Sequence, residues 1–358
     1  MRIAIVTDAW APQTNGVVTT LAATARELVR RGHDARILSP EGLRCLPCPS
    51  YPEIRLALWP GPFIAGRLKT FRPHAIHIAT EGPLGLAARR YCRSRGVSFT
   101  TSYHTRYPEY LAERWPIPPR VSYAWLRRFH RSAARTFVSN ESLRAELAGH
   151  GFGALHLWRR GVDTSRFHAG YPPHPELRDL PRPIMVYAGR LAVEKNLAAF
   201  LDLKLPGTQL LIGDGPQRAA LAARYPRAVF AGYRYGEELA TLLAGSDVFV
   251  FPSLTDTFGI AMVEAMACGL PVAAFPVTGP LDVLRSGVTG VMSRDLGEAI
   301  RGALRLDRAH CAAAASEFTW EAATSQFLTG LEPIPLRARA RLAVGVSAII
   351  ASRAGERP

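Results

Sequence analysis

The sequence is poor in cysteine and has no long apolar run. Five cysteines in 358 residues do not make a disulfide framework. Cys45 and Cys48 have C-x-x-C spacing, but no second pair follows, so a loop with two thiols is favoured over a zinc or redox site. No segment approaches the roughly 20 apolar residues that cross a bilayer. Residues 1–6 are too short for a signal-peptide core and predict the first strand of a cytosolic domain.

Acidic residues are scarce relative to basic ones. The chain has 29 Asp and Glu against 44 Lys and Arg, a net charge of +15. This excess indicates an anionic partner, which could be nucleic acid, an anionic membrane surface or a phosphate-bearing substrate. Nucleic acid is the weakest of the three, because the chain has no zinc finger, no aromatic RNA-binding signature and no clear helix-turn-helix pattern.

Arginines are concentrated between Arg89 and Arg135, where eleven of them are opposed only by Glu109 and Glu113. Aromatic residues are interleaved with these arginines: Trp115, Tyr123, Trp125 and Phe129. Arginines and aromatics on a helix suit anionic lipid headgroups. The alternative is a general arginine bias spread over solvated faces. The membrane interpretation is favoured.

Strand-like apolar runs alternate with helical patterns along the chain, which predicts βαβ units and parallel sheets. A proline-rich stretch at residues 170–183 indicates a change of domain. The strands expected before it are residues 2–6, 34–38, 53–57, 74–79, 97–102 and 135–139, and those after it are 184–188, 208–212, 228–231, 247–251 and 271–275.

The most informative stretch contains Asp256 and Glu264, which are separated by seven residues. A buried strand precedes the pair, and a helix is expected from Ile260 to Cys268. The loop between strand and helix lies where open α/β sheets bind ligands. Backbone N–H groups at the helix start suit an anion, and the two carboxylates suit sugar hydroxyls and a ribose diol. The spacing alone also allows a surface Asp and a solvated Glu.

Residues 253–264 resemble the acidic-x7-Glu signature of retaining glycosyltransferases of family 4, with Asp256 in place of the common first Glu. This variant, and Arg160 in place of an Asn, are similar to the branch that glycosylates membrane lipids or transfers mannose. The resemblance covers most of residues 1–330. It implies the α/β fold called GT-B, in which two Rossmann-like domains with parallel sheets face each other across a cleft.

The resemblance also implies the domain organisation. Residues 1–168 would form the acceptor-side domain and residues 183–318 the nucleotide-sugar domain, and a last helix at about 319–331 would cross back onto the first domain. The tail at 336–358 has about ten apolar residues flanked by arginines. It could be an interfacial helix or a frayed end.

The catalytic roles follow from the resemblance as well. Arg190 and Lys195 would hold the leaving diphosphate, since fixed cations there stabilise the transition state more than the ground state. Glu264 would bind the ribose, and Asp256 with His104 the transferred sugar. The leaving diphosphate would take the acceptor's proton in a front-face attack. The chain has no Asp-x-Asp motif, so neither a metal nor another cofactor is expected.

Further contacts are expected on both substrates. Asn15 is expected to tolerate a left-handed backbone where the family often has a glycine. Two of the acceptor-side residues named below have another possible role: Glu81 could be a helix-start Glu, and Arg160 could pair with an acid. The donor-binding residues are expected to be Asn15, Gly16, Gly189, Asp214, Gly215, Tyr233, Phe258, Gly259 and Ile260, and the acceptor-side residues Glu81, Tyr103, Arg106 and Arg160.

The sequence thus predicts a retaining hexosyltransferase that uses a UDP- or GDP-sugar and a hydroxyl acceptor, a membrane lipid such as diacylglycerol. It would lie in the cytoplasm, peripheral on the inner face of the cell membrane, and bind no nucleic acid. One alternative is a GDP-mannose-dependent α-mannosyltransferase acting on a glycan or glycolipid. An alternative of another class is a non-catalytic protein that binds a membrane or a nucleotide sugar.

Overall fold

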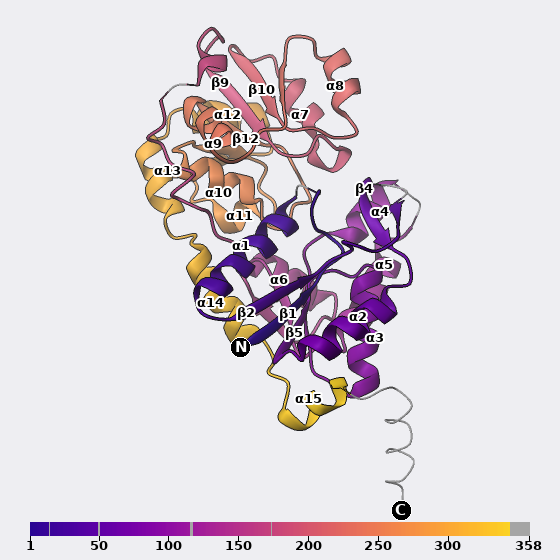
Figure 1. The fold of residues 1–358 in the computed structure, drawn as a ribbon. Helices are drawn as coiled ribbons and strands as arrows, with labels where there is room; N and C mark the ends of the chain where they lie inside the picture. Colours follow the sequence, from indigo (N-terminus) through magenta and orange to yellow (C-terminus); the bar gives the residue numbers. More distant parts are fainter. Residues whose placement is uncertain (14, 49–50, 115–116, 173, 344–358) are drawn as a thin grey trace, which may run out of the picture. The chain divides into compact units, whose positions relative to one another are not determined.

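The computed structural model describes residues 1–13, 15–48, 51–114, 117–172 and 174–343. The chain forms two compact units (Figure 1), of which the first is Met1–Arg159 with Ala323–Pro358 and the second is Arg160–Ala322. Residues 160–168, which the sequence assigned to the first domain, therefore belong to the second unit. The helix expected at 319–331 is α14 (Trp320–Gly330), which begins in the second unit and ends in the first.

The first unit is built on a parallel six-stranded sheet with the order β2-β1-β5-β6-β7-β8. Its central strands are mostly apolar, and all their residues except Arg2 are buried, which explains why the sequence predicted them. The strands are β1 (Arg2–Val6), β2 (Asp34–Leu38), β5 (Ala75–Ile78), β6 (Thr100–Ser102), β7 (Thr136–Val138) and β8 (Leu155–Leu157). The helices are α1 (Gly16–Arg30), α2 (Pro60–Phe71), α3 (Pro83–Arg95), α4 (Tyr107–Arg114), α5 (Pro119–His130) and α6 (Glu141–Gly149).

Two expectations for this unit were wrong. The run at 53–57 is part of β4 (Tyr51–Ala57), which pairs antiparallel with β3 (Cys45–Cys48) and not with the parallel sheet. Both strands contain a proline, which cannot donate a ladder hydrogen bond and is therefore excluded from central strands. Cys45 and Cys48 consequently lie on a strand and not in a loop, and both are free thiols.

The second unit contains another parallel six-stranded sheet, with the order β11-β10-β9-β12-β13-β14. All five predicted strands are present, and the short β14 was missed. The strands are β9 (Ile184–Ala188), β10 (Thr208–Ile212), β11 (Val229–Gly232), β12 (Val248–Phe251), β13 (Val272–Ala274) and β14 (Gly290–Met292). The helices are α7 (Leu197–Leu201), α8 (Arg218–Arg224), α9 (Gly236–Gly245), α10 (Ile260–Ala267), α11 (Pro280–Val283), α12 (Leu296–Ala303) and α13 (Arg308–Ala315), with 3₁₀ turns η1 (Pro175–Leu177) and η2 (Val193–Lys195).

Each sheet has a point at which the strand order reverses. In the first sheet it lies between β1 and β5, and in the second between β9 and β12. Loops that leave the carboxyl ends of strands at such a point open a crevice in which α/β proteins bind ligands. The topology therefore brings the loop after β9, with Gly189 and Arg190, beside the loop after β12, with Asp256.

The C-terminal segment completes the first unit. Phe327 on α14 is fully buried against Phe137 and Trp158. The helix α15 (Leu336–Ala343) follows, with Leu342 fully buried and the Tyr91 hydroxyl donating to its carbonyl at 2.9 Å. The first part of the predicted tail is thus a packed helix and not a frayed end, whereas 344–358 lie outside the described residues. None of the helices that the structure describes is long and apolar enough to cross a membrane.

Candidate functional site

The loops after β9 and β10 are packed backbone to backbone. The Gly189 N–H donates to the Ile212 carbonyl and the Leu191 N–H to the Asp214 carbonyl, both at 2.9 Å. Gly213 has φ of 139°, and a Cβ added there would lie 1.9 Å from the Gly189 carbonyl oxygen. Only glycine fits this position. The close approach fixes the course of the loop that carries Arg190.

Arg190 directly follows this contact and is half-buried. The Tyr187 hydroxyl donates to the Arg190 carbonyl at 2.9 Å, which anchors the backbone under the guanidinium. Lys195 ends the turn η2 of the same loop. The Ser253 hydroxyl connects this loop with the loop after β12, because it donates to the Glu194 carbonyl at 3.2 Å.

Lys195 and Asp256 form an ion pair across these two loops. The Lys195 Nζ lies 2.6 Å and 2.8 Å from the two Asp256 carboxylate oxygens, and the side chains are only 19% and 17% exposed. Burial alone would lower the pKa of the Lys195 ammonium, but the charge and hydrogen bonds of Asp256 outweigh it and raise that pKa to about 12. The site therefore holds a fixed cation whose partner is the carboxylate that the sequence singled out.

The loop after β12 leads into α10 through Gly259, which has φ of 83°. No side chain caps the helix start, so the N–H groups of its first turn face the loop region at the carboxyl edge of the sheet. The Phe258 ring is 3% exposed and packs in the core. Of the predicted contacts Phe258, Gly259 and Ile260, Phe258 can therefore offer only its backbone.

Glu264 lies on α10 and is half-buried. Burial raises the pKa of its carboxyl to about 7, against a smaller opposing effect of the Arg166 charge. The sequence did not identify Arg166, because nothing in the spacing of residues 166 and 264 indicates that they are neighbours. A carboxyl group held near its ionisation point can accept hydrogen bonds from a diol once it is ionised.

The raised pKa of Glu264 predicts a pH-dependent stability. A carboxyl whose folded pKa lies above its unfolded value of 4.5 contributes stability below pH 4.5 that is lost as the pH rises through about 7. Glu264→Gln removes this titration. We expect the variant's melting temperature to exceed that of the parent protein at pH 8, with the difference shrinking towards pH 5. Thermal unfolding of both proteins without ligand across this range is the measurement, and a constant difference would contradict the assignment.

Asp214 and Tyr233 lie beside each other after β10 and β11. The Asp214 carboxylate accepts the Gly215 N–H at 2.7 Å, and the Tyr233 hydroxyl donates to the Asp214 carbonyl at 3.3 Å. The Tyr233 ring is stacked on the Tyr235 ring with centroids 5.8 Å apart, and both are exposed. An exposed stacked pair of this kind offers a flat face for an aromatic ring.

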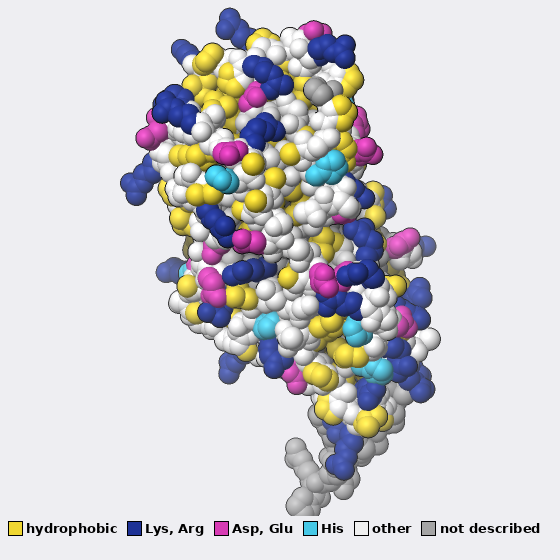
Figure 2. Space-filling view, turned by 90° about the vertical axis from the view of Figure 1, so that its left-hand side faces the viewer, with side chains coloured by type: hydrophobic (Ala, Val, Ile, Leu, Met, Phe, Trp, Pro, Cys, Tyr) yellow, Lys and Arg dark blue, Asp and Glu magenta, His cyan; other side chains and the backbone are white. Residues whose placement is uncertain are grey.

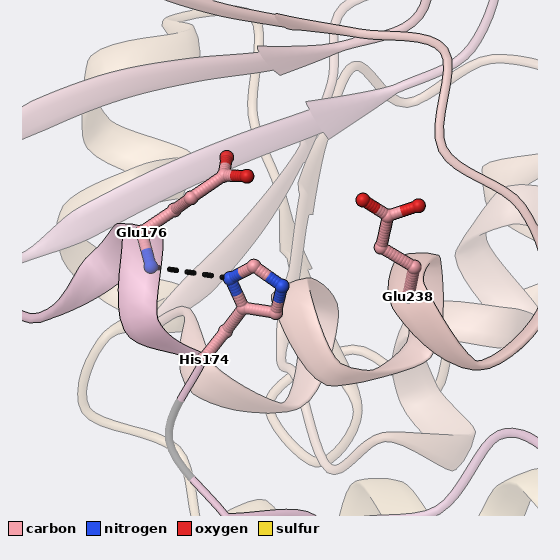
Figure 3. A group of neighbouring side chains, drawn as sticks. All are labelled: His174, Glu176 and Glu238. Atoms are coloured by element: carbon pink, nitrogen blue, oxygen red, sulfur yellow. Dashed lines mark hydrogen bonds between the residues drawn. The ribbon is translucent and has the colours of Figure 1, made fainter.

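One group in the described part of the chain has the spacing of a metal site, namely His174, Glu176 and Glu238 (Figure 3). Arg234 already forms ion pairs with Glu176 at 3.0 Å and with Glu238 at 2.8 Å. The His174 Nδ1 accepts the Glu176 N–H at 3.3 Å. One guanidinium thus pairs with both acids, and the three side chains form an ion-pair network.

In the first unit, Asn15 differs from the expectation. Its backbone is extended, with φ of −157°, and its side chain accepts the Val17 and Val18 N–H groups at 3.0 Å. Asn15 is therefore the N-cap of α1 and does not occupy a left-handed turn. Gly16 is the first residue of α1. The left-handed backbone expected at Asn15 was wrong, because the same side chain that suits turns also caps helices.

His104 follows β6 and is nearly buried, with its ring 5.6 Å from that of Trp158. Two of the predicted acceptor-side residues, Tyr103 and Arg106, lie near it in the chain. Tyr103 is fully buried and packs on Phe152, so its side chain has no surface for an acceptor. The Arg106 guanidinium is buried and pairs with Glu146.

Glu81 is also buried, and its carboxylate lies 3.2 Å from the His130 Nε2. The other ring nitrogen of His130 lies 2.9 Å from the Thr101 hydroxyl. The sequence missed His130. Its signal, one histidine among ten at the end of a helix, is not distinctive.

In the second unit, Arg160 is buried, which lowers the pKa of its guanidinium to about 9.

Comparisons with known proteins agree with this architecture. The family description "Glycosyltransferase Family 4" matches residues 14–166, and "Glycosyl transferases group 1" matches residues 182–306. A GDP-mannose-dependent alpha-mannosyltransferase of Mycobacterium tuberculosis is 34% identical over 316 residues, which cover 82% of this chain and 83% of the relative. A sulfoquinovosyl transferase of Arabidopsis thaliana is 32% identical over 301 residues, covering 77% and 56% of the two chains.

Among solved structures, sucrose-phosphate synthase from Thermosynechococcus elongatus has a TM-score of 0.73 at 20% identity, covering 92% of this chain and 97% of that one. The two parallel sheets and this likeness define the fold as GT-B. With both family matches and a relative at 34% identity, the chain belongs to glycosyltransferase family 4.

Proposed function

We propose that this protein transfers a hexose from a nucleotide diphosphate sugar to the hydroxyl of a membrane lipid, with retention of the anomeric configuration. The observation that carries the proposal is the Lys195–Asp256 ion pair at the strand-order reversal of the second sheet, beside Arg190. The fixed ammonium of Lys195, the guanidinium of Arg190 and the N–H groups at the start of α10 together suit a diphosphate.

The donor contacts divide among the second unit's loops. Arg190, Lys195 and the N–H groups of Gly259 and Ile260 bind the diphosphate, and Glu264 binds the ribose. Asp214 and Gly215 lie under the nucleotide, with Gly189 close by, and the exposed ring of Tyr233 stacks on the base. Each role uses the chemistry that the structure gives the residue: charge, free N–H groups, a titrating carboxyl or an aromatic face.

The chemical step needs no protein nucleophile. The acceptor oxygen forms a bond to the anomeric carbon as the bond from that carbon to the diphosphate oxygen breaks. The electron pair stays on the diphosphate, which takes the acceptor's proton. Arg190 and Lys195 stabilise the charge that develops there. Asp256 keeps Lys195 in place, and its remaining lone pairs accept hydroxyl groups of the sugar.

The remaining contacts of the proposal come from the first unit and from Arg160 of the second. His104 binds the transferred sugar, and the N–H groups at the α1 start, Gly16, held by the Asn15 cap, bind the phosphates. Arg160 adds a cation for the diphosphate or an anionic acceptor. Glu81 acts through its pair with His130 by shaping the loops after β5 and β6, and does not touch the acceptor itself.

GDP-mannose is the first donor to test, because the relative at 34% identity is named for it. A UDP-hexose is the alternative. The supporting argument for a lipid acceptor is the excess positive charge of +15, which favours an anionic surface. We therefore propose that the protein acts in the cytoplasm, peripheral on the inner face of the cell membrane.

The test is a donor panel with GDP-mannose, UDP-glucose, UDP-galactose and UDP-glucuronate, each with diacylglycerol vesicles and with a soluble mannoside. Thin-layer chromatography identifies the product, and the anomeric proton–carbon coupling identifies its configuration. We expect one donor to give an α-linked glycolipid. Transfer only to the soluble mannoside would favour the glycan-directed alternative, and donor binding without turnover would favour a non-catalytic protein.

A further inference from the structure

Two neighbouring helices of the first unit, α3 and α5, have no acidic residue. On α5 one face is buried in the unit, and the opposite face presents Val121, Trp125 and Arg128 at helical spacing. Val121 is 56% exposed and Trp125 is 48% exposed. Arg93 is exposed on α3. We call Arg93, Val121, Trp125 and Arg128 the α3/α5 face.

The two helices are joined by Arg89. Its guanidinium donates to the Phe129 carbonyl at 2.9 Å and to the Arg128 carbonyl at 2.8 Å, both at the end of α5. Burial, and then the charges of Arg93 and Arg128, lower the pKa of Arg89. Arg93 and Arg128 are thus each close enough to Arg89 to repel its guanidinium. Neither Arg93 nor Arg128 forms an ion pair with any residue that the structure describes.

The apolar part of the face is held rigidly. The Trp125 ring is stacked on Phe129, with centroids 6.2 Å apart and an interplanar angle of 28°. Phe129 itself is 3% exposed and belongs to the core. Trp125 therefore projects from a fixed base, with Val121 one turn earlier. Tryptophan is enriched at the level of lipid headgroups, because its ring is apolar and its N–H is polar.

We propose that the α3/α5 face docks onto an anionic lipid bilayer, with Trp125 and Val121 entering the headgroup region and Arg93 and Arg128 contacting lipid phosphates. The proposal rests on the lipid acceptor of the proposed function. Charge complementarity favours an anionic surface, and an exposed aliphatic side chain favours a bilayer over nucleic acid. On the face drawn in Figure 2, by contrast, Lys and Arg side chains are interspersed with Asp and Glu.

The experiment is sedimentation of the full chain with vesicles of phosphatidylcholine alone and with 30% phosphatidylglycerol. The wild-type protein should sediment only with the anionic vesicles. Each basic residue at a membrane contributes about 1 kcal/mol, so Arg93→Gln with Arg128→Gln should lower the partition coefficient about 30-fold. Trp125→Gln should also weaken binding, and the loss should persist in high salt, because it is not electrostatic.

The matched control is the double variant Arg227→Gln/Arg305→Gln. Both arginines are exposed in the second unit, and replacing them removes the same amount of charge. Equal losses in both double variants would overturn the proposal, because the effect would then be one of net charge. So would loss of binding in Trp59→Gln, whose side chain is 89% exposed, without loss in Trp125→Gln. Binding to a DNA duplex and not to vesicles would overturn it as well.

Activity separates this inference from the proposed function. With a short-chain acceptor dispersed in detergent, the Arg93→Gln/Arg128→Gln variant should transfer sugar at the wild-type rate, since no bilayer has to be bound. Vesicle binding with no transfer under any condition would contradict the proposed function and leave the docking face standing. If the double variant transfers sugar to vesicle lipid as fast as the wild-type protein, the docking face is overturned and the proposed function is not.

Discussion

Lys195→Ala is expected to lower the rate of sugar transfer by about two to three orders of magnitude, the range typical of a lost electrostatic contact to the transition state. The Lys195 ammonium is held 2.6 Å from the Asp256 carboxylate, so its position is set before a donor binds. Without it, the negative charge that develops on the leaving diphosphate loses a fixed cation. In the variant, the Asp256 carboxylate would also lie near the diphosphate's negative charge with no lysine to pair with. Steady-state kinetics with the preferred donor is the measurement.

Lys204→Ala is the matched control, because Lys204 is an exposed lysine of the same unit. It should retain wild-type kcat. Melting temperatures of both variants separate a catalytic loss from unfolding. A second comparison uses Asp256→Asn and the double variant: because the two side chains form one pair, their losses should not add. Near-normal transfer by a folded Lys195→Ala protein would refute the role given to this lysine.

Gly213→Ala is expected to destabilise the second unit by about 3 kcal/mol or more, among the largest single-residue effects. The added Cβ would lie 1.9 Å from the Gly189 carbonyl oxygen, and neither backbone can move without breaking the hydrogen bonds between the loops after β9 and β10. The φ of 139° adds strain that an L side chain rarely tolerates. Urea denaturation of the two proteins measures the difference.

Gly236→Ala separates the steric clash of an added Cβ from the strain of a positive φ. Gly236 also has a positive φ, 58°, but no atom lies within 4 Å of an added Cβ. It should therefore show only the cost of the left-handed backbone, about 1 kcal/mol. Similar destabilisation by Gly213→Ala and Gly236→Ala would mean that the loop at Gly189 yields to the new methyl group, and that its position is not fixed by this contact.

The sequence predicted the central strands of both sheets because they are continuous apolar runs, such as Ile184–Ala188. It missed β8 and β14, two edge strands that have no continuous apolar run, since β8 is Leu-His-Leu and β14 is Gly-Val-Met. It misplaced β4 because residues 53–57, Glu-Ile-Arg-Leu-Ala, predict a strand but do not indicate its partner. The partner is β3, a short neighbouring strand that the sequence did not reveal.

For the candidate site, sequence indicated the loops but not the contacts between them. Arg190, Lys195 and Asp256 were recognised by the strands that they follow and by family resemblance. That Lys195 and Asp256 form one ion pair could not be predicted, since 61 positions separate them and only the strand order places their loops together. The pair of Glu81 with His130 was hidden for the same reason. Asn15 was misinterpreted because local propensity allows both a turn and a cap.

The course of α14 has a consequence for how the protein is made. Phe327 fills the core of the first unit between His77 and Trp158, yet the ribosome adds it only after the whole second unit. The amino-terminal residues therefore leave the ribosome with a gap in their core. Domains generally fold as units during synthesis. Here the second unit has all its residues first, and the first unit is completed last, when the end of α14 and then α15 arrive.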